Sequence, residues 1–189
     1  MMITISTHQL LRAIATSAAG VWLGGMILIA IVAQTTFSVM RQTGVDQPNT
    51  VAGQIMAVNF TRFDKVQMIC AAVLVLSQTV LIIAGERKTT DWLRLVLILL
   101  ATGMLLYSVT VLTPKITNLQ SAVGTPDPEA AVKAVFDDFH DTAVRISKVN
   151  LVLVTLTLFS LAWPSKRKKE AQYGGADWQP PDEPPSERS

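Results

Sequence analysis

The sequence predicts an all-α membrane protein, a four-helix transmembrane bundle in which helices 2 and 4 extend into an extracytoplasmic helical cap. Three observations lead to this fold class. Half of the 189 residues are hydrophobic. Only 16% are charged, whereas soluble domains carry about 25%. The chain also contains uncharged stretches of about 20 residues, the length that crosses about 30 Å of hydrocarbon.

Four membrane spans are expected, at about residues 13–33, 66–84, 95–112 and 143–163. The first three contain no charged residue. The fourth carries Arg145 and Lys148 near its outer end, where long basic side chains can extend to the membrane surface. A cleaved signal peptide is the alternative for the first span, because Arg12 precedes it and residues 31–33 fit a cleavage site. The length of that span favours retention.

The placement of lysine and arginine predicts that both termini lie in the cytoplasm. With four spans, the N-terminus, the loop at 85–94 and the C-terminal tail share one side of the cell membrane. That side holds Arg12, Arg87, Lys88, Arg94, Lys166, Arg167, Lys168, Lys169 and Arg188. The other basic residues are spread over two much longer segments. The tail at 164–189 is charged and then proline-rich, a composition that predicts disorder.

Two amphipathic helices are expected outside the membrane, at about 50–65 and 128–148. In the second, apolar residues recur every three or four positions from Val132 to Ile146, the spacing of one helical face. Asp127 followed by Pro128 is a good helix start. We expect the two helices to pack on each other as the cap. The alternative is that one lies on lipid or binds an unidentified membrane partner.

Small and polar residues inside the spans indicate how the helices meet. Gly20, Gly24 and Gly25 form a groove that suits close helix packing. Packing within the chain is expected, and a homo-oligomer formed through the first span is the alternative. Gln78 and Asn150 need hydrogen-bond partners in lipid. A polar tunnel reaching either residue would favour a solute-binding protein or conduit, whereas a sealed apolar interior would favour a structural or accessory role.

The candidate chemical site is a metal site formed by Asp137, His140 and Asp141. These residues lie within about one and a half helical turns, and an imidazole with two carboxylates can hold a divalent metal. A solvated acidic face is the alternative.

Other functional classes find little support in the sequence. It shows no nucleophile with a base, no phosphate-binding loop and no paired zinc motif. The net charge of +2 is too small for a nucleic-acid reader. We therefore expect a non-enzymatic protein without a cofactor, whose partner is the lipid bilayer.

Several short motifs occur in a recognisable order: residues 22–25 (Trp-Leu-Gly-Gly), Phe37, residues 112–114 (Leu-Thr-Pro), residues 139–140 (Phe-His) and Asn150. Over about residues 10–163 the chain resembles the family called domain of unknown function 4149, related to transmembrane protein 205. This resemblance implies a four-helix membrane domain without an assigned reaction. The first motif is also similar to copper-resistance D-type proteins, which implies a metal ion. Thioethers are soft ligands for Cu(I), but the seven methionines lack close pairing, which favours packing.

Overall fold

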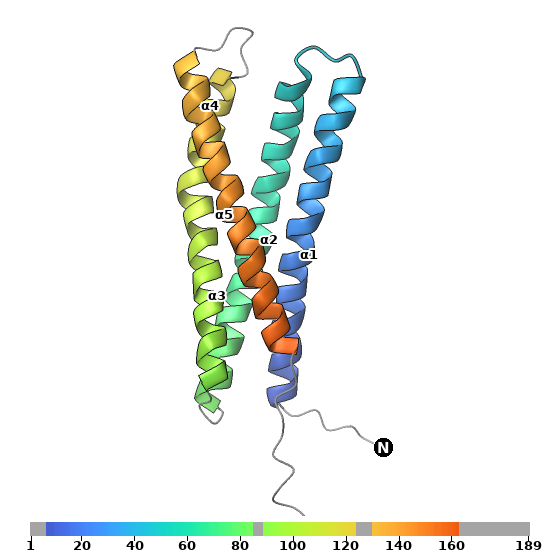
Figure 1. The fold of residues 1–189 in the computed structure, drawn as a ribbon. Coiled ribbons are helices and arrows are strands. Elements are labelled where there is room, and N and C mark those ends of the chain that lie inside the picture. The colour runs from blue at the N-terminus through green and yellow to red at the C-terminus, as the bar shows by residue number, and fades with distance from the viewer. Residues whose placement is uncertain (1–6, 85–88, 124–129, 163–189) are drawn as a thin grey trace, which may run out of the picture.

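A computed structural model describes residues 7–84, 89–123 and 130–162, and every regular element in these ranges is a helix. The elements are α1 (Thr7–Gln42), α2 (Pro48–Ala84), α3 (Thr89–Tyr107), η1 (Ser108–Leu112), α4 (Thr113–Val123) and α5 (Ala130–Ala162). Because η1 is a π-helical turn that continues α3 into α4, the described chain forms four long rods (Figure 1). The predicted all-α, four-helix class is confirmed.

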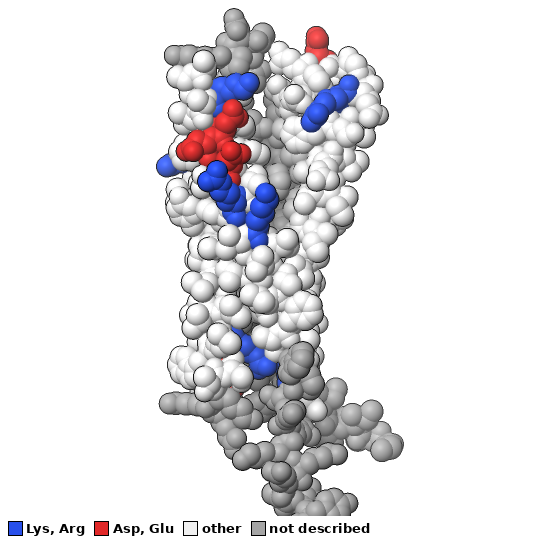
Figure 2. Space-filling view, viewed as in Figure 1, with Lys and Arg blue, Asp and Glu red and all other residues white. Residues whose placement is uncertain are grey.

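Each of the four rods is long and apolar enough to cross a membrane. Figure 2 shows an uncharged belt around the middle of the molecule, with charged side chains beyond both of its edges. Along the α3–α4 rod, roughly 32 Å of helix rise separates Arg94 from Lys115, which matches a hydrocarbon thickness of about 30 Å. The chain is a multi-pass membrane protein.

The helices are arranged so that α1 and α3 each contact both α2 and α5. Consequently α2 and α5 stand diagonally across the bundle. The first and last described residues, Thr7 and Ala162, lie at the same end, which we call the inner end (Figure 1). The α1–α2 turn and α4 lie at the opposite, outer end. Gly44 ends α1 with a φ of +65°, a backbone conformation that glycine adopts without steric cost.

The inner half of the bundle is filled by an apolar core. Trp22 is fully buried in its centre, among small side chains such as Ala15, Ala19 and Ala101 that allow the helices to approach closely. The other members of this core are Cys70, Ala71, Leu74, Ile98, Leu105, Val154 and Leu161. These buried side chains form one continuous apolar cluster.

The outer half differs from the predicted two-helix cap. The amphipathic outer parts of α2 and α5 do not pack on each other. The outer part of α2 lies beside α1, whereas that of α5 lies beside α4 (Figure 1). The expectation was wrong because it ended the first span at residue 33 and the third at residue 112. Both helices continue outward, to Gln42 and Val123, and provide the missing partners.

Pro114 explains why the third span was expected to end early, and the π-turn explains why it does not. Proline lacks an N–H and its ring collides with the carbonyl four residues earlier in a regular α-helix. In η1 the Thr113 N–H donates to the Ser108 carbonyl, five residues back. This wider turn lets the helix continue past Pro114. The Asp127–Pro128 helix start and the tail at 164–189 lie outside the described residues.

Candidate functional site

A cavity of about 540 Å³ lies in the outer half of the bundle, between the α1–α2 pair and the α4–α5 pair. We call it the outer cavity. Figure 2 shows the molecular surface hollowed between the two pairs of helices. Along α2 the cavity extends from Gly53 to Gln67, roughly 21 Å of helix rise. Small-molecule sites in proteins have volumes of about 300–1,000 Å³, so the cavity can hold a ligand.

The walls of the outer cavity are mainly apolar. Aromatic rings from three helices line its outer part, with methionine and aliphatic side chains between and below them. The lining residues used below are Met26, Phe37, Met56, Ala57, Phe60, Phe63, Met104 and Phe136. Mostly apolar walls with a few convergent polar groups are typical of binding sites for small organic molecules.

Two buried amides form the floor of the outer cavity. Gln67 is 8% exposed and Asn150 is 4% exposed, and both line the cavity. Gln67 lies roughly 15–17 Å outward from Gln78 of α2, and Asn150 lies as far outward from Leu161 of α5. Gln78 and Leu161 form hydrogen bonds at the inner end, so both amides lie close to the middle of a bilayer. Below them begins the apolar core around Trp22. The outer cavity is therefore a one-ended pocket in this conformation.

The Asn150 amide oxygen has no hydrogen-bond partner among the described residues, although it is fully buried. The same is true of the Trp22 indole N–H. Arg12 of α1 bonds to Leu161 of α5, and from that contact both Trp22 and Asn150 lie roughly 15 Å outward. Buried polar groups nearly always have partners, so a ligand at this level of the bundle could donate to the Asn150 oxygen or accept from the Trp22 N–H.

Two charged residues line the lower part of the outer cavity on opposite walls. Asp64 of α2 is half-buried, whereas Lys148 of α5, the diagonal helix, is exposed. In the part of the chain that the structure describes, neither side chain has an ion-pair or hydrogen-bond partner. Asp64 lies roughly 21 Å outward from Gln78, and Lys148 roughly 18–20 Å outward from the end of α5. Both are therefore farther outward than the floor amides.

The π-turn η1 determines which residues of α4 reach the outer cavity. Met104, Leu105 and Ser108 line it before the turn, and Thr113, Ile116, Thr117 and Gln120 line it afterwards. In an uninterrupted α-helix these two groups would face directions roughly 120° apart. The wide turn adds about one residue, or 100°, and brings the two groups onto one face.

At its outer end the cavity is crossed by a side chain from α4. Gln120 reaches α2 so closely that a Cβ at Gly53 would lie 2.6 Å from its Nε2. Between α4 and α5, the Lys115 ammonium lies 4.8 Å from the centroid of the Phe139 ring. This cation–π contact joins α4 to α5.

The predicted metal site does not form. His140 lines the outer cavity, and its ring stacks on Phe136 with centroids 6.0 Å apart and an interplanar angle of 8°. Asp137 and Asp141 are exposed and do not line the cavity. Among the described residues no group of three His, Cys, Asp or Glu side chains could hold a metal ion. The reason is geometric: His140 belongs to the apolar edge of α5, whereas the carboxylates lie on its solvated arc.

The three predicted packing glycines have different surroundings. A Cβ at Gly25 would collide with the Phe63 ring, whereas a Cβ at Gly20 or Gly24 would meet nothing within 4 Å. Only Gly25 therefore serves close packing between α1 and α2. The expectation that Gly20 and Gly24 pack within the chain was wrong, because the face of α1 buried in the core is that of Ala15, Ala19 and Trp22.

A polar cluster at the inner end joins all four helices, and the sequence analysis predicted only that one member, Gln78, needs a hydrogen-bond partner. Its members are Arg12, Gln78, Asp91 and Arg94. Gln78 Nε2 donates to the Asp91 carbonyl at 3.0 Å. Arg94 donates to the Asp91 carboxylate at 3.0 Å and to the Ser160 carbonyl at 2.6 Å. The arginines had been used only to assign the orientation of the spans.

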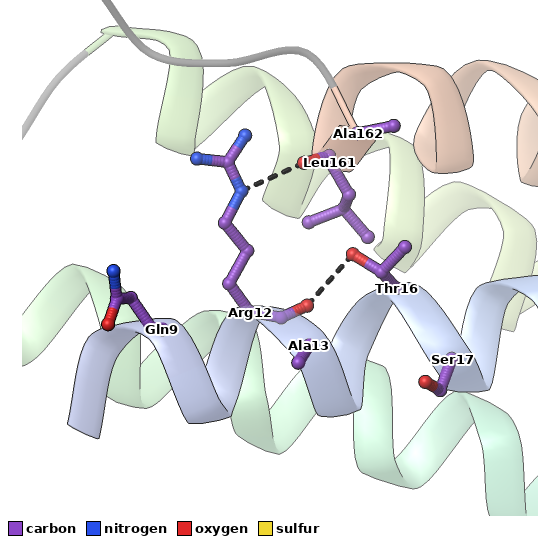
Figure 3. Close-up of a pocket in the computed structure, with 7 residues that line it drawn as sticks. All are labelled: Gln9, Arg12, Ala13, Thr16, Ser17, Leu161 and Ala162. Atoms are coloured by element: carbon purple, nitrogen blue, oxygen red, sulfur yellow. Dashed lines mark hydrogen bonds between the residues drawn. The ribbon is translucent and has the colours of Figure 1, made fainter. Parts of the chain in front are cut away.

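Figure 3 shows the environment of Arg12 in an open surface hollow at the inner end. The Arg12 Nε donates to the Leu161 carbonyl at 2.8 Å, and Thr16 Oγ1 donates to the Arg12 carbonyl at 2.8 Å. The last carbonyls of a helix have no partner within it and attract cations. Arg12 and Arg94 thus cap the inner end of α5.

Comparison with known proteins gives one family and no individual relative. No curated protein and no solved structure matches the chain. The family model described as "Domain of unknown function (DUF4149)" matches residues 17–124. This region contains the first-span glycines and Pro114, whereas Phe139, His140 and Asn150, which the sequence resemblance had included, lie beyond it. Since the match covers more than half of the chain, the protein belongs to the DUF4149 family.

Proposed function

We propose that this membrane protein is a non-enzymatic binding protein for a single-chain amphiphile, which it holds in the outer cavity. The observation that carries the proposal is a pocket with apolar walls that descends to the buried amide of Asn150. A cavity that reaches Asn150 favours binding of a small molecule over a purely structural role. The apolar walls favour a hydrocarbon chain, and the polar groups near the floor favour a head group.

The same geometry favours binding over conduction. The inner core around Trp22, Leu74 and Val154 fills the bundle below the floor. A solute that entered from the outer end would therefore stop near the middle of the membrane.

We place the protein in the cell membrane with both termini in the cytoplasm. In the expected four-span topology, basic residues are concentrated on the side that holds the two termini, and such residues favour the cytoplasmic side. Cysteine labelling tests this orientation. A membrane-impermeant maleimide should label Thr43→Cys in intact cells and Thr7→Cys only after permeabilisation. Labelling of Thr7→Cys in intact cells would reverse the orientation, and the cavity would then open toward the cytoplasm.

Binding can be tested with probes that share one C12 chain: dodecanol, dodecyl phosphate, dodecyltrimethylammonium and dodecylphosphocholine. We expect calorimetric titration of the protein in amphipol to show one bound molecule per chain for at least one probe. Ala57→Phe should remove this binding, because Ala57 lines the cavity. Ala72→Phe is the matched control, since Ala72 is an exposed residue of the same helix outside the cavity. Equal binding by the two variants would exclude the outer cavity as the site.

A further inference from the structure

We propose that the head group bound in the outer cavity is zwitterionic, with its cationic part beside Asp64, its anionic part beside Lys148, and its chain directed outward. This inference rests on the proposed function and names the ligand class of the same cavity. It starts from two opposite charges that line one cavity without pairing with each other or with other described residues.

The depth of the two charges makes their lack of partners informative. The polar cluster at Arg12 and Arg94 lies at the inner end, and Asp64 and Lys148 lie roughly 18–21 Å outward from it. Both therefore lie in the outer half of a hydrocarbon layer of about 30 Å that begins at this cluster, with Asp64 half-buried and Lys148 exposed. Ionisable residues at such depth usually face a cavity or a partner and mark functional sites.

The position of the two charges on different helices favours a head group with two charges. Asp64 belongs to α2 and Lys148 to α5, the helices that stand diagonally across the bundle. An anionic ligand would satisfy Lys148 but would leave the Asp64 carboxylate unpaired and repelled. A cationic ligand would pair with Asp64 but would leave the Lys148 ammonium unpaired and repelled. A zwitterion satisfies both, and like-charge contacts in a partly buried site are costly.

The distribution of polarity along the cavity determines the direction of the ligand. The floor amides, Gln67 and Asn150, lie beneath the two charges, and the Asn150 oxygen still lacks a partner. The outer part is lined by Phe37, Phe60 and Phe136. The polar head therefore belongs near the floor and the hydrocarbon chain between the aromatic rings, toward the outer end.

The four C12 probes test this assignment because they share one chain and carry neutral, anionic, cationic and zwitterionic head groups. We expect dodecylphosphocholine to bind roughly tenfold more tightly than the anionic, cationic and neutral probes. One additional charge-assisted hydrogen bond raises an affinity by about this factor. Asp64→Asn should reduce its affinity to that of dodecyl phosphate, and Lys148→Gln to that of dodecyltrimethylammonium. Asp138→Asn and Lys133→Gln are matched controls, because both residues are exposed on α5 outside the cavity.

The outcomes separate this inference from the proposed function. Equal affinities for all four probes, with binding still removed by Ala57→Phe, would overturn the zwitterion assignment and leave an amphiphile site in place. The same conclusion follows if the variants at Asp64 and Lys148 behave like their controls. Absence of binding for every probe would overturn both. Thermal unfolding of each variant shows that a lost affinity is not a lost fold.

Discussion

Arg12 and Arg94 donate to successive carbonyls of the same helix: Arg12 Nε to the Leu161 oxygen at 2.8 Å and Arg94 Nη2 to the Ser160 oxygen at 2.6 Å. The two arginines come from α1 and α3, so the end of α5 is held by two helices that stand at opposite corners of the bundle. Partly buried cations at a helix C-terminus stabilise it by up to about 2 kcal/mol. This arrangement leads to the first prediction.

Arg94→Leu should lower the free energy of unfolding by about 2–4 kcal/mol, because it removes a buried charge partner and leaves the Asp91 carboxylate unpaired. The Arg94 side chain is only 12% exposed, so water replaces its contacts poorly. Thermal unfolding in detergent, followed by circular dichroism, measures the loss. Arg41→Leu is the control, since Arg41 is exposed at the end of α1. Equal effects of the two substitutions would contradict the capping role.

Gly25→Leu and Gly24→Leu should differ although the positions are adjacent. A side chain at Gly25 meets the Phe63 ring, whereas Gly24 faces open space. Overpacking costs about 1–3 kcal/mol, so we expect that loss at Gly25 and a change within about 0.5 kcal/mol at Gly24. The same thermal unfolding measurement applies. Similar destabilisation at both positions would show that the Gly24 face is covered.

Analytical ultracentrifugation of the Gly24→Leu variant also tests the homo-oligomer that the small residues of the first span suggest. Small residues on a lipid-facing helix surface favour association of two copies. If α1 forms that seam, the dimer fraction should fall while the unfolding temperature stays unchanged. An unchanged sedimentation profile would assign Gly20 and Gly24 to lipid contact instead.

Lys115 and Phe139 should be energetically coupled. A double-mutant cycle with Lys115→Met and Phe139→Leu is expected to give a coupling free energy of about 0.5–1 kcal/mol, the usual value of an exposed cation–π contact. Thermal or denaturant unfolding of the four proteins provides the cycle. Coupling of zero would mean that α4 is held to α5 by apolar contacts alone.

His140→Ala should leave divalent metal binding unchanged. The imidazole stacks on Phe136 and lines the outer cavity, apart from the exposed carboxylates of Asp137 and Asp141. Titrations with Zn²⁺ and Cu²⁺ should therefore give the same heats for wild type and variant. Loss of a one-to-one binding event in the variant would restore the metal site that the sequence suggested.

The helices were predictable because lipid imposes a simple rule on sequence. Uncharged runs of about 20 residues identify spans, and the four rods of the structure contain the expected segments as far as the described residues extend, to Ala162. Their outer extensions were harder to predict. Residues 34–42 and 113–123 are more polar, and their helical state depends on neighbours that sequence spacing does not reveal. Pro114 was interpreted as the end of a span, since proline usually interrupts a helix.

The outer cavity could be predicted only in part. Asn150 was recognised as an interior polar residue because a buried amide in an apolar stripe is unusual. Asp64 and Lys148 were missed as a pair, because they are far apart in sequence and each resembles an ordinary charge near a membrane surface. Their relation depends on the diagonal placement of α2 and α5, a tertiary property. The inner polar cluster was missed for the same reason, apart from the need of Gln78 for a hydrogen-bond partner.

The π-turn at Ser108–Leu112 has a consequence for how members of this family are aligned. A relative with a regular α-helix here would need one residue fewer to present the same side chains to its interior. Positions equivalent to Thr117 and Gln120 would then appear shifted by one, and a gap opened near Val109 would restore the correspondence. An alignment forced through without that gap would match lipid-facing residues of one protein with pocket-facing residues of another.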